Sequence, residues 1–468
     1  MLFLFILLNA YFVSFTDKPQ KDAPALSPRA VEQRQKWNIP TDDLDYPVCR
    51  MYVDSVQHMG GKLYHTSRWM NGATFEMSES VADKVAQLRF VTDVEMTRDN
   101  SQSYVSKRIM PNEHIRRTSP EPPRATDDQL ALYNLFPLLL QDFRGQGILM
   151  TICDNGFYNA NTLGCFRQSE LELGHFDFTD DADDFYGPNG THGTECLSVI
   201  SGIADDFYGA ATGAQYYLMR SEEEATESPK EMDNLVAAME KADSLGTNVF
   251  SASLGYAIFD NSEWTLPKSA LDGRTTRVSR AATIAARKGM LVCIAAGNEG
   301  NKAWHTISAP ADADSILTVG AVDINGEIGS FSSYGPSADG RVKPDVCAVG
   351  VSTCIYTPYD YVTYGNGTSF ATPLLAGMAA TLWSALPDES AMQIRERIIR
   401  SADRYNQPDE SRYGYGIPDA WEAYTMDLPE DLPTIDAATE KPRKFIDGGQ
   451  IYILRHGHIY NLAGQLVR

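Results

Sequence analysis

The sequence predicts an α/β fold in which a mainly parallel sheet carries helices on both faces, preceded by a small α+β domain of ferredoxin-like type. Two short apolar runs, Gly147–Cys153 and Met290–Ile294, have the near-continuous hydrophobicity of strands buried on both sides. Helices alternate with strands in this region: helices at Met232–Ala242 and Arg280–Lys288, strands at Val249–Ser253 and Leu291–Ala295. This alternation favours right-handed crossovers between parallel strands.

The α+β domain is expected near the N-terminus, before the first of these buried strands. Its strands are predicted at Tyr11–Phe15, Lys62–His65 and Phe90–Met96. Its two helices are predicted at Ser27–Trp37 and Val81–Leu88, which completes a βαββαβ-like module.

The most informative segment is Gly367–Pro373, which places Ser369 on a glycine-flanked turn directly before an apolar helix. A serine hydroxyl is a poor nucleophile at neutral pH, so catalysis needs a histidine base, an acid that orients it, and donors for an oxyanion. Upstream, Asp154 ends the first buried strand, His192 precedes an apolar helix, and Asn298 follows the second buried strand. The carboxyl ends of strands are where open α/β sheets place their sites.

At these residues the sequence resembles the subtilisin-like serine peptidases, the subtilase or S8 family, and the likeness extends over roughly Gln129–Trp421. The resemblance implies that Asp154 orients the imidazole of His192, which accepts the Ser369 proton. It also implies that the Asn298 amide and the Ser369 backbone N–H stabilise the tetrahedral oxyanion. Pro373 is expected near the first turn of the following helix, where it costs no hydrogen bond.

The same resemblance implies a polypeptide substrate. Ser253, Leu254 and Gly255 look like the extended substrate-binding strand of the family, whose backbone pairs with a peptide by strand addition. Two further stretches, Phe331–Pro336 and Lys343–Val346, match the family's framework and receive no chemical role. One departure is Asn155, because the family usually has Thr or Ser after the catalytic acid; we expect activity to survive this change.

Two readings of function from different classes stay open. The first is a serine endopeptidase that forms an acyl-enzyme; the second is a catalytically silent subtilisin-fold protein that binds peptides. The presence of Asp154, His192, Ser369 and Asn298 together favours the first. An esterase of the α/β-hydrolase type is excluded, because that class runs serine, acid, histidine along the chain, and here the serine comes last.

Charge and composition narrow the partners. The 468 residues carry a formal net charge of -22, which opposes binding to nucleic acid and to anionic membranes by repulsion. With 43% hydrophobic residues the chain has material for a sizeable core. An acidic stretch between Asp154 and His192 could hold structural calcium, but its ligand spacing is incomplete; we predict a solvated loop and no metal or cofactor. Its members are Asp177, Asp180, Asp181, Asp183 and Asp184.

Seven cysteines make an odd number, so at least one is unpaired or joins another chain. Cys347 and Cys354 are the pair closest in sequence, and nothing in the sequence fixes a pairing. Cys153 and Cys293 lie in predicted buried strands, where cysteine usually acts as a small hydrophobe.

The N-terminal run Leu2–Leu8 has the length of a signal-peptide h-region and is too short to span a bilayer, so residues 1–10 predict export to the periplasm or the medium. No basic residue precedes the run, which leaves the true start codon open. Residues 11–98 resemble the propeptides of secreted subtilases, those of Bacteroidetes members above all, and imply a propeptide that inhibits its own peptidase domain.

Residues 99–128 are polar and proline-bearing and are predicted to be an exposed linker, with Arg116-Arg117 as a candidate processing site. The peptidase domain is predicted at residues 129–426. Beyond it, residues 427–468 are predicted as an acidic linker and a short tail, in which Ile451–Leu462 forms a β-hairpin. The histidines His456 and His458 are expected to be exposed on that hairpin and to bind no metal.

Overall fold

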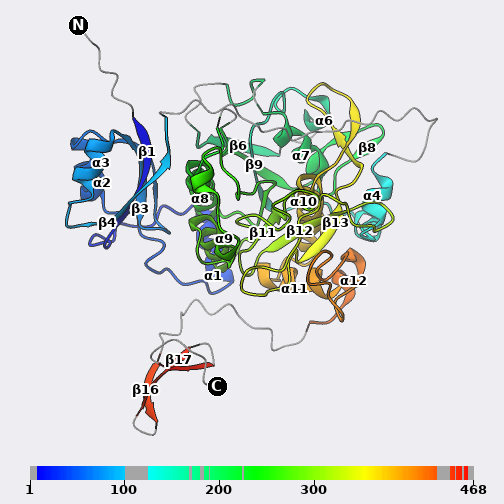
Figure 1. Ribbon diagram of the computed structural model, residues 1–468. Helices are drawn as coiled ribbons and strands as arrows, with labels where there is room; N and C mark the ends of the chain where they lie inside the picture. Colours follow the sequence, from blue (N-terminus) through cyan, green and yellow to red (C-terminus); the bar gives the residue numbers. More distant parts are fainter. Residues whose placement is uncertain are drawn as a thin grey trace. The chain divides into compact units, whose positions relative to one another are not determined.

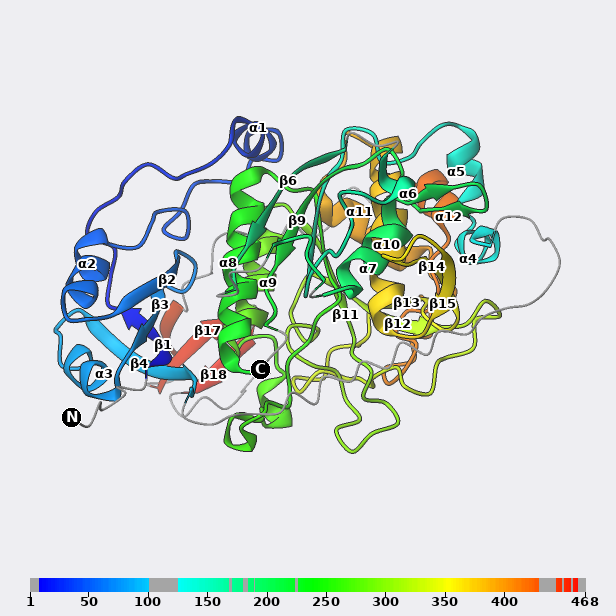
Figure 2. The same ribbon diagram turned by 90° about the horizontal axis from the view of Figure 1, so that it is seen from above.

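The computed structural model describes residues 8–100, 125–167, 171–179, 184–188, 190–223, 226–428, 443–447, 450–455 and 458–461 of the chain. The chain forms two compact units, residues 1–429 and 430–468. In the first unit a small N-terminal domain lies beside a larger α/β domain (Figures 1 and 2). Across the described residues, no helix combines the length and the apolar character needed to cross a bilayer.

The larger domain is built on a parallel sheet that, within the described residues, has seven strands in the order β13-β12-β11-β10-β5-β9-β6. The strands are β5 (Leu149–Asp154), β6 (Glu172–Asp177), β9 (Gln215–Arg220), β10 (Val249–Ala252), β11 (Leu291–Ala295), β12 (Leu317–Val322) and β13 (Val346–Val349). The predicted mainly parallel sheet is confirmed.

Helices cover both faces of this sheet, as predicted. Alternate residues of a strand point to opposite faces, so Leu291 and Cys293 of β11 pack in one core while Val292 and Ile294 pack in the other. The first core contains α7 (His192–Ser201) and α10 (Thr368–Ala385). The second contains α8 (Pro229–Leu245) and α9 (Arg277–Arg287).

Shorter elements complete the larger domain. They are α4 (Asp127–Ala131), α5 (Phe136–Leu140), α6 (Gly164–Arg167), β7 (Ile203–Ala204), β8 (Phe207–Tyr208), β14 (Thr353–Tyr356), β15 (Val362–Gly365), α11 (Ala391–Arg400) and α12 (Ala420–Thr425), with 3-10 turns at Ser262–Trp264 and Lys268–Ala270.

Helix α8 has clear start and stop signals. Pro229 occupies its first turn, and the Glu231 carboxylate accepts a hydrogen bond from the backbone N–H of Ser228 at 3.2 Å. It ends at Gly246, whose φ of 79° is a left-handed conformation that glycine adopts without a side-chain clash. A β-carbon at Gly246 would also lie 2.7 Å from the backbone nitrogen of Ala30, so glycine permits a close approach there.

The small N-terminal domain is an antiparallel sheet with the order β2-β3-β1-β4. Its strands are β1 (Asn9–Phe15), β2 (Lys62–Ser67), β3 (Gly72–Met77) and β4 (Val91–Arg98). Helices α2 (Arg50–His58) and α3 (Glu79–Val85) pack their buried valines against Val13 and Phe75 of the sheet. The strands β1, β2 and β4 contact α8 of the larger domain. This is the βαββαβ arrangement that the sequence predicts.

The prediction was wrong about which segment supplies the first helix of that module. Ser27–Trp37 does form a helix, α1 (Pro28–Lys36), with Ser27 as its N-cap, but α1 contacts α8 of the larger domain instead of joining the small core. The helix that joins the small core is α2, which the sequence analysis missed. The reason is physical: α2 buries Val53 and Val56, whereas α1 buries Ala30 and Arg34.

The two ends of the chain are described in part. Residues 1–7 lie outside the described residues, and β1 begins at Asn9, within the predicted signal region. In the second unit β16 (Arg443–Asp447), β17 (Gln450–Arg455) and β18 (His458–Asn461) pair as an antiparallel sheet. The predicted hairpin corresponds to β17 and β18, and β16 adds a strand; His456 lies outside the described residues. Arg116, Arg117, Asp180, Asp181 and Asp183 also lie outside them.

Candidate active site

Asp154 and His192 meet at the carboxyl edge of the sheet. Asp154 is the last residue of β5 and is fully buried; His192 is the first residue of α7. The His192 Nδ1 atom lies 2.7 Å from Asp154 Oδ1, which also accepts the backbone N–H of Asn155 at 2.8 Å. This bond fixes Nδ1 as the protonated nitrogen and leaves Nε2 to accept a proton. Asn155 therefore contributes its backbone donor to the acid.

Two opposing effects act on the pKa of His192. Burial lowers the pKa of His192, but the negative charge of Asp154 and the hydrogen bond to it raise the pKa by more. The pKa of His192 therefore lies well above its ordinary value of 6.5. The second oxygen of Asp154, Oδ2, is buried and has no hydrogen-bond partner. Among the described side chains, the imidazole of His192 is thus the hydrogen-bond partner of this carboxylate.

Ser369 is the second residue of α10 and is 3% exposed. Phe370 directly follows Ser369, and the centroid of its ring lies 5.7 Å from that of the His192 ring. The imidazole therefore lies at the start of α10. Among the described contacts, no hydrogen bond joins His192 to the Ser369 hydroxyl. In unliganded enzymes such catalytic hydrogen bonds are often long and tighten only when substrate binds.

Pro373 lies inside α10, and this corrects the expectation that it occupies the first turn without loss of a hydrogen bond. Proline has no N–H, so the carbonyl four residues earlier loses its partner within the helix. That carbonyl belongs to Ser369. It instead accepts hydrogen bonds from the Ser253 hydroxyl at 2.7 Å and the Cys196 thiol at 3.3 Å.

The Ser253 hydroxyl therefore helps to hold the backbone of the candidate nucleophile in place. The residues Ser253, Leu254 and Gly255 follow β10, whose register with β5 and β11 stops at Ala252. They extend past the edge of the sheet: Ser253 and Leu254 are buried and Gly255 is exposed. The Ser253 side chain thus brings this segment next to the Ser369 carbonyl.

Asn298 lies on the other side of Ser369. Its Oδ1 accepts hydrogen bonds from the backbone N–H and the hydroxyl of Thr368, at 2.9 and 3.0 Å. A β-carbon placed on Gly367 would lie 3.6 Å from Asn298 Nδ2, 3.5 Å from the Ser369 backbone nitrogen and 3.6 Å from Ser369 Cβ. The Asn298 Nδ2 atom and the Ser369 backbone nitrogen therefore both lie within 3.6 Å of one point beside Gly367.

Three supporting residues were missed in the sequence. The Cys196 thiol contacts both nitrogens of His192, at 3.8 and 3.9 Å, and burial raises the pKa of Cys196 to about 11, so the thiol stays neutral. The Thr368 hydroxyl and the Ser333 hydroxyl accept the backbone N–H groups of Gly297 and Glu299, which hold the loop that carries Asn298. The position of Cys196 one helical turn after His192 was a signal that could have found it.

One further cluster has the residue types of a metal site. Glu222, Glu227 and Glu231 bring carboxylate oxygens within 4.8 Å of one another at the start of α8. Glu222 accepts a hydrogen bond from the Tyr256 hydroxyl, and Glu231 accepts the backbone N–H of Glu223 at 2.8 Å. These carboxylates already serve as acceptors within the fold, and we assign no metal to them. Asp177 of the acidic stretch pairs with Arg220.

Comparison with known proteins decides the family. A sequence model described as the subtilase family of S8 peptidases matches residues 145–416. The chain belongs to the subtilase family. A second model, the S8 propeptide domain of Bacteroidota, matches residues 10–113, which include the small N-terminal domain. The protein is thus a subtilisin-like serine peptidase with a propeptide domain.

Curated relatives agree with this assignment. The subtilase is 26% identical to serine protease AprX of Bacillus subtilis over 325 residues, which are 60% of this chain and 66% of AprX. It is 30% identical to subtilisin DY of Bacillus licheniformis over 287 residues, which are 59% of this chain and 90% of that protein.

Solved structures share the fold. The crystal structure of MycP1 from Mycobacterium smegmatis superposes with a TM-score of 0.54 at 21% identity and covers 69% of this subtilase and 92% of MycP1. The likeness confirms the subtilisin-like architecture.

Proposed function

We propose that this subtilase is an exported serine endopeptidase, made as a propeptide-inhibited precursor, that hydrolyses peptide bonds through Asp154, His192 and Ser369. The observation that carries the proposal is the 2.7 Å contact between His192 Nδ1 and Asp154 Oδ1, beside a serine at the start of α10. An oriented imidazole next to a serine hydroxyl is the arrangement that activates oxygen as a nucleophile.

In the first half of the reaction, Ser369 Oγ attacks the carbonyl carbon of the scissile bond and its proton passes to His192 Nε2. The tetrahedral oxyanion is stabilised by Asn298 Nδ2 and the Ser369 backbone N–H, which face the same volume over Gly367. His192 then gives its proton to the departing amine, which leaves an ester on Ser369. In the second half, water adds to the ester carbonyl and His192 accepts a proton from that water. The bond to Ser369 Oγ then breaks, His192 returns the proton to Oγ, and the acid product leaves.

A polypeptide is the natural substrate of this site. The backbone of Ser253–Gly255 leaves the sheet edge beside Ser369 and is available to pair with an extended peptide. The propeptide domain contacts α8, and we propose that it blocks the cleft until the segment that follows residue 100 is cut. Export is supported by the apolar run Leu2–Leu8.

The test is labelling of purified protein with a fluorophosphonate probe, which forms a covalent bond with an activated serine. Wild type, Ser369→Ala and the control Ser384→Ala, which removes a hydroxyl near the far end of α10, are compared on a gel. We expect wild type and Ser384→Ala to be labelled as a shortened species and Ser369→Ala to remain unlabelled and full length.

Three other outcomes would each contradict part of the proposal. Labelling of Ser369→Ala would remove this residue as the nucleophile. Labelling of full-length wild type would contradict inhibition by the propeptide. No labelling, even after limited proteolysis that strips the propeptide, would leave a catalytically silent peptide-binding protein. Cell fractionation tests export separately: mature protein in the cytoplasm alone would contradict it.

A further inference from the structure

The propeptide domain contains a segment that leaves its own fold. After β1 the chain departs from the small sheet, forms α1 against the peptidase domain, and returns to begin α2 at Arg50. We call residues 16–48 the arm. Figure 2 shows α1 at one end of α8, away from the β1–β4 sheet. The arm is therefore a second place at which the propeptide region meets the peptidase.

The arm caps the C-terminal end of α8. The backbone N–H and the hydroxyl of Ser27 donate to the carbonyls of Ser244 and Leu245 at 2.8 and 2.9 Å, and Arg29 Nε donates to the Gly246 carbonyl at 3.1 Å. The last carbonyls of a helix have no partner within the helix, and a cation is favoured at this negative end of its dipole. α8 is thus completed by residues of the propeptide region.

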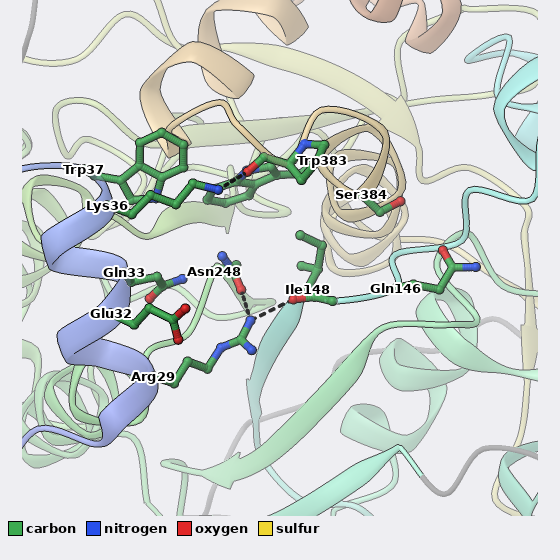
Figure 3. A pocket seen from close by; sticks show the side chains of 12 residues that line it. Arg29, Glu32, Gln33, Lys36, Trp37, Gln146, Ile148, Asn248, Trp383 and Ser384 are labelled. Atoms are coloured by element: carbon green, nitrogen blue, oxygen red, sulfur yellow. Dashed lines mark hydrogen bonds between the residues drawn. The ribbon is translucent and has the colours of Figure 1, made fainter.

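Arg29 also holds the start of two strands. Its Nη2 donates to the Gly147 carbonyl at 2.8 Å and to Asn248 Oδ1 at 2.6 Å, as Figure 3 illustrates for Asn248. Gly147 lies just before β5 and Asn248 just before β10. These are the amino ends of the strands whose other ends lead to Asp154 and Ser253. The arm therefore binds at the amino ends of β5 and β10, whereas the candidate active site lies at the carboxyl ends of the strands.

A buried network of ion pairs joins the arm to the peptidase, and each side supplies both a cation and an anion. Arg34 of the arm, 5% exposed, pairs with Asp243 of α8 at 2.8 Å and with Asp45 of the arm at 2.6 Å. Lys288, at the end of α9, pairs with Asp45 at 2.8 Å and Asp42 at 2.9 Å. Removing one member of such a network leaves a buried charge without its partner, which is strongly unfavourable.

The contact between α1 and the peptidase mixes polar and apolar side chains. A cavity of about 260 Å³ remains between α1 and the peptidase, lined in part by Glu32, Gln33, Gln146 and Trp383 (Figure 3). At its rim the Lys36 ammonium donates to the Pro387 carbonyl at 2.6 Å. Charged contacts of this kind fix the register in which the arm docks on the peptidase.

We propose that the arm is a second anchor that keeps the propeptide region bound to the peptidase after the connecting segment has been cut, an inference that rests on the proposed inhibition by the propeptide. The β1–β4 module and the arm both contact α8, and Arg68 and Arg34 both pair with Asp243, so release requires both sets of contacts to open together. Linked elements of this kind prolong binding by orders of magnitude over either alone. The arm lies at the amino ends of the strands, away from the candidate catalytic residues, so it does not block the site itself. Its role is to set how long the inhibitory propeptide stays bound.

The test follows dissociation of the cut propeptide region and does not depend on catalysis. The full chain carries Ser369→Ala, and a recognition sequence for a site-specific protease is inserted between Arg116 and Arg117. After cutting, the peptidase part is immobilised through a C-terminal tag and the release of the propeptide region is timed. Arg29→Ala should release it at least about tenfold faster than the parent. Lys21→Ala, whose ammonium pairs with Asp43 of the arm itself, should leave the rate unchanged.

Ser27→Ala serves as a second variant in case Arg29→Ala fails to fold, which a melting curve of the uncut chain would reveal. Ser27→Ala removes one hydrogen bond to α8 and the side-chain cap of α1, and it should accelerate release by a smaller factor. Higher salt should speed release from the parent and from Arg29→Ala alike, because the ion pairs of Arg34 with Asp243 and of Lys288 with Asp45 remain in both. Equal release rates for parent, Arg29→Ala and Ser27→Ala would overturn the proposal, as would immediate loss of the propeptide region from the cut parent.

Discussion

The pair of Asp154 and His192 sets the pH range in which the site can work. A general base must be unprotonated to accept a proton, and the carboxylate holds the pKa of His192 well above 6.5 in spite of burial. The same shift affects stability. Because the folded-state pKa is the higher one, the stabilisation is fully present below pH 6.5 and is lost as the pH rises through the folded-state pKa.

We expect kcat/KM to rise with pH along an acid limb whose midpoint lies above 6.5, because protonated His192 cannot act as the base. Asp154→Asn should lower that midpoint, since the carboxylate charge is removed, and should reduce kcat by about 10⁴-fold. A pH profile of peptide hydrolysis measures both. A midpoint that stays in place in Asp154→Asn would show that another group controls the limb.

The volume beside Ser369 makes a separate prediction at the residue scale. Gly367→Ala would place a methyl group 3.6 Å from Asn298 Nδ2, beside the volume in which we propose that the oxyanion is held, and would strain a backbone whose φ is 158°. We expect kcat to fall by about 10²-fold or more while Ser369 keeps its place in α10. Steady-state kinetics check this, with a melting curve as the control for folding. An unchanged kcat would mean that the oxyanion binds elsewhere.

At the scale of elements, α10 combines a buried helix with a proline that interrupts its hydrogen bonds. The interruption exposes the Ser369 carbonyl to Ser253 and Cys196, which belong to a loop after β10 and to α7. Three elements are thereby tied together at one backbone atom of the candidate nucleophile. Pro373 is therefore part of how the serine is positioned.

Ser253→Ala should weaken this tie. The buried carbonyl would keep only the weak thiol donor, so we expect the free energy of unfolding to fall by about 1–3 kcal/mol and kcat to fall by about tenfold with little change in KM. Ser253→Thr, which keeps the hydroxyl, should restore much of the loss. Ser201→Ala is a matched control, because that hydroxyl bonds the Leu197 carbonyl of α7, away from Ser369.

Equal kinetic effects of Ser253→Ala and Ser201→Ala would remove the positioning role of Ser253. Denaturant unfolding in the Ser369→Ala background supplies the stability values without self-digestion.

The sequence predicts those parts of the fold and site that local patterns encode. Asp154 and Asn298 stand at the ends of continuous apolar runs and Ser369 lies in a distinctive turn, so the sequence indicated the positions of these residues at the ends of strands and the start of a helix. The path of the arm was not predictable. Arg34 finds Asp243 at a separation of 209 residues, and a single charged residue gives no periodic signal of such a partner.

The whole molecule contains no disulfide among its cysteines, all seven of which lie in described residues and are buried as free thiols. Cys347 and Cys354, the pair closest in sequence, lie in β13 and β14 and are not bonded. Burial raises the pKa of Cys165 to about 12, and Cys196 is similarly protected. Thiolates are the reactive form, so the native thiols are expected to be inert.

Alkylation followed by mass spectrometry tests this. We expect no modification of the folded precursor carrying Ser369→Ala, and seven alkylated thiols after unfolding without reductant. Fewer than seven after unfolding would reveal a disulfide.

The position of β1 in the middle of its sheet has a consequence for synthesis. β1 is synthesised before β3 and β4, with which it pairs, so its sheet cannot close before residue 98 has emerged. The arm forms its contacts later still, because its partners Asp243 and Lys288 come far later in the chain. Long loops must close before these contacts form, which is slow. The arm thus docks after the small sheet has closed, and a chain that ends before α8 leaves Arg34 without Asp243 as its partner.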